Sequence, residues 1–209
     1  MTLEEAIAKI KPLDHNAMEI AQKRWDSIAK PLHSLGKLET LLIQIAGITG
    51  NAEVDLSRRG LIAMCADNGV VEEGVTQTGQ EVTAIVAENF LKYDTSVGVM
   101  CKQNHAEIFP VDMGMVTDTK VRTDHKIAYG TQNMTKGPAM TREQAVKGLE
   151  AGIDMVRELN DKGYRILATG EMGIGNTTTS SAVASVLLKQ PVEEMTGRGA
   201  GLTLSLIHI

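Results

Sequence analysis

Hydrophobic and polar positions divide the chain into a helical N-terminal part and a longer part in which strands and helices alternate. In residues 1–50, apolar side chains recur at three- and four-residue spacing, which is typical of amphipathic helices. Thr2 and Glu5 have the spacing of a capping box, and Asp14 can cap a second helix. A third helical pattern covers 37–46. We therefore expect residues 1–50 to form a small helical region that belongs to a smaller domain.

From Gly60 the pattern changes to short apolar runs separated by helical segments. The apolar runs predict strands over 61–66, 107–111 and 164–168, the last of them buried. Helical spacing predicts helices over 80–93, 96–103, 142–162 and 180–188, the last packed on the sheet. This alternation predicts an α/β fold, a parallel Rossmann-like sheet covered by helices, with ligands at the carboxyl ends of the strands. The polar segment 116–138 is long for a loop, which favours a functional or interface role.

A glycine-rich turn, GEMGIGNTTT at 170–179, joins the third strand to the last helix. Such a turn presents backbone N–H groups and the positive end of a helix dipole to an anion, most often a phosphate. Its spacing matches the nucleotide-binding pattern G-x-x-x-x-G-K-[ST], except that Asn176 stands in place of the lysine. Without that lysine we expect a smaller ligand, such as a monophosphate. The alternative is a tight strand-to-helix turn that binds nothing.

Each predicted strand ends in a short segment that places a carboxylate beside glycine. These segments are DNG at 67–69, DMG at 112–114 and GEMG at 170–173. Because the carboxyl ends of parallel strands meet at one edge of a sheet, the three segments should converge on a single site.

The amino-acid composition limits the kinds of molecule that the chain is expected to bind. The chain has 209 residues, is 43% hydrophobic and 22% charged, and carries a net charge of -5 with a pI near 5.6. These values are typical of a globular protein and argue against nucleic acid or an anionic membrane as the main partner. Cys65 and Cys101 are the only cysteines and are expected to be buried thiols in a reducing cytoplasm. No spacing of cysteine or histidine predicts a metal site, and no apolar run or signal-peptide pattern predicts a membrane segment.

Several motifs occur together and in one order along most of the chain. They are KPLHSLGKLE at 30–39, DNGV at 67–70 with EGV at 73–75, QEVT at 80–83, ENFL at 88–91, VDMG at 111–114, GEMGIGNTT at 170–178 and GRGAG at 197–201. In this combination the chain resembles the nicotinate-nucleotide–dimethylbenzimidazole phosphoribosyltransferases of cobalamin biosynthesis. The resemblance implies an α/β phosphoribosyl-binding domain over 51–203, no cofactor, and a homodimer for the full-length protein.

The resemblance also implies a reaction and roles for particular residues. The ribose phosphate of nicotinate mononucleotide passes to a nitrogen of 5,6-dimethylbenzimidazole, which gives nicotinate and α-ribazole 5'-phosphate with inversion at the anomeric carbon. Glu171 is the candidate carboxylate that stabilises positive charge at that carbon, and its alternative role is to complement the helix dipole. Base binding is assigned to Gln80 and Thr76. Phosphate or nucleotide binding is assigned to Gly173, Ile174, Gly175, Asn176, Thr177 and Thr178.

The sequence departs from the family pattern in several places. The family's general-base glutamate lies in a C-terminal segment that has no counterpart here, so we expect a truncated, inactive fragment with exposed apolar surface. Residues 204–209 (LSLIHI) resemble a translated sequencing adaptor, so they are expected to be a non-native tail, and His208 is not expected to be a ligand. His33 stands where the family commonly has glycine, and Asn68 stands where it commonly has histidine. We expect His33 to lie in a surface loop, and Asn68 carries no titrating proton.

Two other functional classes remain open at this point. The first is a fragment that binds a nucleotide monophosphate or a benzimidazole without turning it over. The second is an NAD-dependent enzyme of the Rossmann type, which is disfavoured because no G-x-G-x-x-G follows the first strand.

Overall fold

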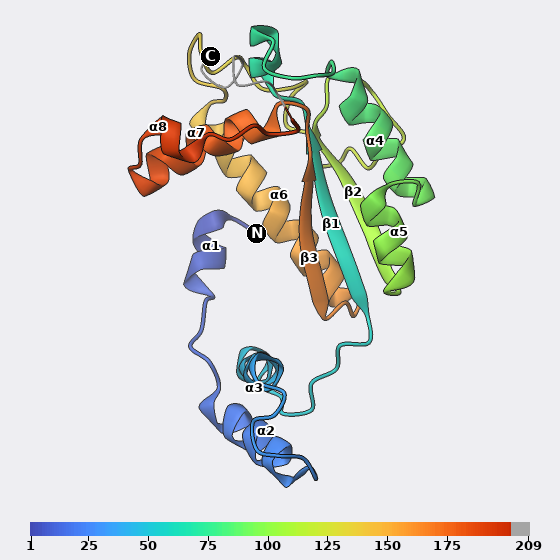
Figure 1. Ribbon diagram of the computed structural model, residues 1–209, viewed down its shortest axis with the longest axis vertical. Coiled ribbons are helices and arrows are strands. Elements are labelled where there is room, and N and C mark those ends of the chain that lie inside the picture. Colours follow the sequence, from blue (N-terminus) through green and yellow to red (C-terminus); the bar gives the residue numbers. More distant parts are fainter. Residues whose placement is uncertain (202–209) are drawn as a thin grey trace. The chain divides into compact units, whose positions relative to one another are not determined.

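The computed structural model describes residues 1–201, so the predicted tail lies outside the described residues. The chain divides into two compact units, Met1–Arg58 and Arg59–Ile209 (Figure 1). No helix in the described part of the chain is both long and apolar enough to cross a bilayer.

The first unit is helical, as the pattern predicts. Its helices are α1 (Leu3–Ala8), α2 (His15–Ser27) and α3 (Lys37–Thr49). The predicted capping box is confirmed, because Thr2 and Glu5 exchange hydrogen bonds of 3.1 Å between side chain and backbone. Asp14 caps α2 by accepting a hydrogen bond of 3.0 Å from the amide of Ala17. The interface between α2 and α3 is built from small residues, and a Cβ at Gly47 would lie only 2.7 Å from the side chain of Met18.

The motif at 30–39 folds around a buried carboxylate. Glu39 is buried, and its Oε1 accepts a hydrogen bond of 3.1 Å from the amide of Leu35 and lies 2.9 Å from Nζ of Lys30. The hydrogen bond from Lys30 lowers the pKa of Glu39 most strongly, against the opposing effect of burial. His33 has a φ of +58°, a left-handed conformation that costs an L-residue energy and that glycine adopts freely. The exposed side chain of His33 agrees with the prediction of a surface loop.

The second unit is an α/β layer structure with a parallel sheet, as predicted. The strands are β1 (Arg59–Ala66), β2 (Ala106–Gly114) and β3 (Ile166–Met172), in the order β2-β1-β3 and all parallel. The helices are η1 (Gly69–Glu73, a 3-10 helix), α4 (Glu81–Lys92), α5 (Ser96–Gln103), α6 (Arg142–Asp161), α7 (Asn176–Leu188) and α8 (Val192–Met195).

Helices cover both faces of the sheet (Figure 1). On one face, α4 contributes Ala84, Ala87 and Phe90 to a core cluster with Ala63 and Cys65 of β1. On the other face, α6 contributes Met155 and Leu159 to a cluster with Ile62, Val111 and Tyr164. Burial raises the pKa of the Cys65 thiol to about 12, and Cys101 is also buried and free, as expected.

Three details of the prediction for 164–188 are wrong. The third strand begins at Ile166 and continues through Met172, because 170–172 pairs with β1 instead of forming a turn. None of its residues is buried, since β3 pairs on one side only within the described residues. The last helix begins at Asn176, four residues earlier than predicted, and it contacts α8. Two apolar residues of this helix, Val186 and Leu187, are 76% and 75% exposed, which agrees with the expectation of exposed apolar surface.

Candidate functional site

The glycine-rich turn after β3 packs tightly against the end of β1. A Cβ at Gly173 would overlap the carbonyl oxygen of Ala66 and lie 2.9 Å from Nδ2 of Asn68. Gly175 has a φ of +88°, and a Cβ there would lie 3.0 Å from Val71. Glycine at these two positions therefore allows the turn to follow the end of the neighbouring strand and then enter α7.

The turn ends as the N-terminus of a helix, which is the arrangement predicted for anion binding. Gly175 is the N-cap of α7 and has no side chain that could cap it. The amide of Thr179 closes the first turn by donating to the carbonyl of Gly175. The preceding amides of Thr177 and Thr178 have no acceptor within the helix, because the first amides of any α-helix lack one. These groups and the helix dipole together favour an anion at this point.

A cleft of about 640 Å³ extends from this helix end along α7 as far as Val186 and reaches Val192 in α8. Four of the predicted site residues line it, namely Glu171, Asn176, Thr177 and Thr178. The cleft is lined further by Val70, Glu73, Val75, Met134, Thr135, Ser180, Ser181, Ala182, Ser185, Val186, Val192, Thr196, Gly197 and Gly199. Polar groups from the end of β3 and from α7 thus share one cleft with valine and methionine side chains. Such a cleft can hold a ligand that has both an anionic and an apolar part.

Glu171 lies in β3 and reaches the first residue of α7. Its Oε1 accepts a hydrogen bond of 2.5 Å from Nδ2 of Asn176. The side chain that replaces the expected lysine therefore orients the carboxylate. The carboxylate is exposed on the cleft, where it can face positive charge on a bound ligand.

The two residues assigned to base binding lie beside the cleft and have internal partners. Nε2 of Gln80 donates a hydrogen bond of 3.1 Å to the carbonyl of Asn68. The hydroxyl of Thr76 donates one of 2.8 Å to the carbonyl of Thr78. Neither is among the described residues that line the cleft, whereas their neighbour Val75 is. The assignment of both residues to base binding stays a prediction.

The long segment that follows β2 forms part of the cleft wall. Glu73 holds this wall, since its Oε1 accepts hydrogen bonds of 2.6 Å from Asn133 and 3.0 Å from Thr135. Both bonds lower the pKa of Glu73, and the bond from Asn133 has the larger effect. Between them Met134 lines the cleft. The length of this segment predicted a functional or interface role, but nothing in its sequence pointed to Met134 or Thr135.

The carboxylates that end β1 and β2 have structural partners. Oδ2 of Asp67 accepts a hydrogen bond of 2.8 Å from the amide of Val116. Oδ1 of Asp112 accepts bonds of 2.9 and 2.7 Å from the amides of Gly114 and Met115. Both side chains are buried at the carboxyl edge of the sheet, where they hold the turns that follow the strands. The three strand ends lie at one edge of the parallel sheet, as predicted. Of their carboxylates only Glu171 lines the cleft, so their convergence on a single binding site is not confirmed.

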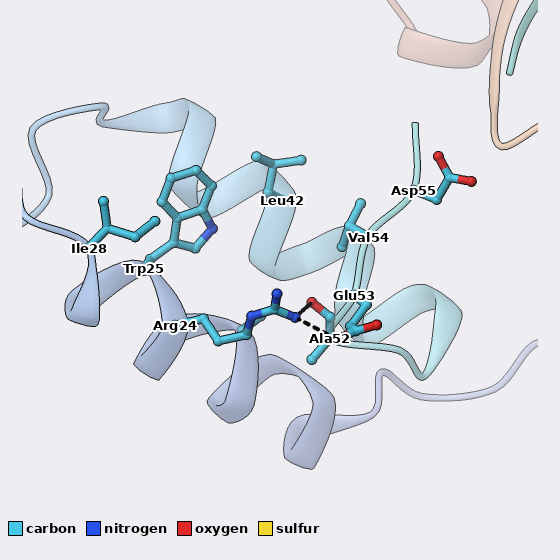
Figure 2. Close-up of a pocket in the computed structure, with 9 residues that line it drawn as sticks. Arg24, Trp25, Ile28, Leu42, Ala52, Glu53, Val54 and Asp55 are labelled. Carbon is cyan, nitrogen blue, oxygen red and sulfur yellow. Dashed lines mark hydrogen bonds and ion pairs between the residues drawn. The ribbon is translucent and has the colours of Figure 1, made fainter. Parts of the chain in front are cut away.

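A second cavity, of about 570 Å³, lies within the helical unit (Figure 2). Trp25, Ile28 and Leu42 form its apolar part. Arg24 reaches across it to the segment that follows α3, 3.4 Å from the carbonyl of Ala52 and 3.5 Å from a carboxylate oxygen of Glu53. No residue predicted to act in binding or catalysis lines this cavity. Within residues 1–201, no group of histidine, cysteine and carboxylate side chains is arranged to hold a metal ion.

The chain is similar to curated proteins that share one name. A protein named nicotinate-nucleotide–dimethylbenzimidazole phosphoribosyltransferase from Ruminiclostridium cellulolyticum is 51% identical over 205 residues, which cover 97% of this chain and 58% of the relative. Its namesake from Clostridium tetani is 47% identical and covers 96% of this chain and 56% of the relative. The chain thus spans less than two thirds of the length of these curated relatives.

Solved structures give the same result at the level of the fold. The crystal structure of CobT from Thermus thermophilus matches with a TM-score of 0.84 at 34% identity, over 92% of this chain and 59% of that chain. The family model DBI_PRT, described as phosphoribosyltransferase, matches residues 10–208. With nearly its whole length matched, the chain belongs to the DBI_PRT phosphoribosyltransferase family.

Proposed function

We propose that this chain binds nicotinate mononucleotide and serves the transfer of its ribose phosphate to 5,6-dimethylbenzimidazole. The observation that carries the proposal is the cleft at the N-terminus of α7, in a chain that belongs to the DBI_PRT family. The names of the relatives supply the two substrates. Because the chain spans only 58% of the first relative, the activity of the whole protein is part of the proposal.

The chemistry of the two substrates suits the cleft. A phosphate monoester accepts hydrogen bonds from the amides and hydroxyls of Thr177 and Thr178 and is favoured by the helix dipole. A flat, apolar base fits beside Val75 and Met134. As the bond from the anomeric carbon to nicotinate breaks, positive charge grows on that carbon, and the carboxylate of Glu171 stabilises it. Gln80 stays assigned to the polar edge of the base.

The test is an assay of the full-length protein, with this chain in parallel, in which nicotinate mononucleotide and dimethylbenzimidazole are supplied and chromatography detects nicotinate and α-ribazole 5'-phosphate; turnover is expected of the full-length protein. Turnover that falls at least about tenfold in Glu171→Gln, with nucleotide affinity retained, supports the proposal. Tight nucleotide binding without any nicotinate release favours the alternative, a fragment that binds the nucleotide without turning it over. Failure to bind the nucleotide refutes both.

We also propose that the full-length protein is a cytoplasmic homodimer, as the family resemblance implies. The free, buried state of Cys65 and Cys101 supports a reducing compartment. Sedimentation equilibrium of the full-length protein tests the homodimer, and a monomer at all concentrations refutes it.

A further inference from the structure

We propose that Asn68 is a positioning residue that keeps the phosphate-binding turn in its anion-binding shape. The inference rests on the proposed function, since it assumes that the turn at 173–178 binds the phosphate of a nucleotide. Asn68 follows the end of β1 and is not among the residues that line the cleft. Its role is therefore to hold the turn and not to touch the ligand.

Both ends of the Asn68 amide bind the turn. Nδ2 donates a hydrogen bond of 3.1 Å to the carbonyl of Ile174. Oδ1 accepts one of 2.9 Å from the hydroxyl of Thr179, in the first turn of α7. One side chain thus ties the middle of the glycine-rich turn to the start of the helix. The backbone of Asn68 is itself held, because its carbonyl accepts a hydrogen bond from Gln80.

These contacts fix the orientation of the peptide groups in the turn. The amide of Ile174 donates a hydrogen bond of 3.0 Å to the hydroxyl of Thr83 in α4, while its carbonyl faces Asn68. Because a trans peptide is planar with C=O and N–H opposed, a carbonyl of Ile174 that faces Asn68 turns the amide of Gly175 the other way. The bond to Thr179 fixes the direction of the first helical turn, and with it the amides of Thr177 and Thr178.

An asparagine side chain suits this role because it is a donor at one end and an acceptor at the other. Alanine removes both bonds. Aspartate keeps the acceptor for Thr179 but presents an oxygen to the carbonyl oxygen of Ile174, which repels it. Thr179→Val removes only the bond at the helix, with little change in side-chain volume. These variants therefore test one at a time the two hydrogen bonds by which the Asn68 side chain holds the turn, which together are called the brace.

The experiment compares two ligands that differ only in the phosphate. Calorimetry of the 209-residue chain measures the affinities for nicotinate mononucleotide and for nicotinate riboside. In Asn68→Ala the nucleotide should bind about tenfold more weakly, while the riboside changes by less than about twofold. Asn68→Asp should weaken the nucleotide at least as much, and Thr179→Val about threefold to fivefold. The matched control is Asn104→Ala, which loses one amide hydrogen bond to Met100 outside the site and should leave both affinities unchanged.

The outcomes separate the brace from the proposed function. If the wild-type chain binds both ligands equally, the turn holds no phosphate, and both the proposed function and the brace are refuted. If the wild-type chain prefers the nucleotide and Asn68→Ala keeps that preference, the phosphate site stands and the brace is refuted. An equal loss of affinity for both ligands refutes it too, because general damage to the fold would act on both. A loss confined to the nucleotide supports it, and Thr179→Val provides the same test if Asn68→Ala does not fold.

Discussion

Replacing Gly173 by alanine tests whether the shape of the glycine-rich turn depends on its close contact with β1. The added methyl would overlap the carbonyl oxygen of Ala66 and lie 2.9 Å from Nδ2 of Asn68. The backbone of Ala66 cannot retreat easily, because it is held in register opposite Gly114 of β2. The turn must therefore move away from β1, and the hydrogen bonds of Asn68 to the turn are strained or lost.

The expected cost follows from two contributions. Inserting a methyl into a packed site costs about 1–3 kcal/mol. Weakening two hydrogen bonds adds about 1 kcal/mol. A total near 3 kcal/mol lowers the midpoint of thermal unfolding by roughly 6–12 °C for a unit of about 150 residues. The affinity for nicotinate mononucleotide should fall by at least about tenfold, since the amides at the start of α7 move with the turn.

Gly152→Ala is the matched control. Gly152 lies in α6, and a Cβ there meets nothing within 4 Å. The same substitution should therefore stabilise the protein, by about 0.5–1 kcal/mol, because alanine is the better helix former. Circular dichroism during heating measures both variants, and calorimetry measures nucleotide affinity. The reasoning is refuted if Gly173→Ala is as stable as the wild type and binds the nucleotide equally well.

Further predictions concern the rest of the chain. His33→Gly should raise the free energy of unfolding by about 0.5 kcal/mol in urea titrations, because it relieves a left-handed φ of +58°; a loss of stability would contradict this. Hydrogen bonds from Arg122 and Lys162, of which the bond from Arg122 has the larger effect, lower the pKa of Glu158 from 4.5 to about 2. Glu158 should therefore stabilise the fold above pH 4.5 and lose that effect as the pH falls toward 2, so Glu158→Gln should cost stability at pH 7 and little near pH 2. An equal cost at both pH values would show that charge is not the cause. Cys65 is buried and the pKa of its thiol is raised to about 12, so it should react with a thiol reagent at pH 8 only after unfolding; rapid labelling of the native protein at this position would overturn the assignment.

The sequence predicted the order and type of the longer helices and of the three strands, because these have strong local signals, whereas η1 and α8 were not predicted. The capping residues of α1 and α2 and the apolar faces of α4 and α6 are local features that tertiary contacts reinforce. The prediction for segment 170–172 was wrong. Glycine and glutamate there favour a turn, but pairing with β1 extends β3 through the segment. The side chains of β3 are not buried because burial depends on which strands pair beside it. The local pattern of apolar residues does not carry that information.

The site was predictable in outline and not in detail. Parallel strands bring their carboxyl ends together, so the place of the site followed from topology alone. The partners of Asn68, by contrast, lie more than a hundred residues away in the sequence, at Ile174 and Thr179. Met134 reaches the cleft only because Glu73 holds the residues on either side of it. Contacts of this kind depend on the folded backbone and leave no periodic pattern.

The most direct test of the account is an NMR titration of the isotope-labelled chain with nicotinate mononucleotide. The account predicts that the backbone amide resonances of Asn176, Thr177 and Thr178 move most, and that nicotinate riboside at the same occupancy leaves them nearly unmoved. If these three resonances stay in place at saturating nucleotide while others move, the phosphate does not bind at the start of α7, and the central claim is contradicted.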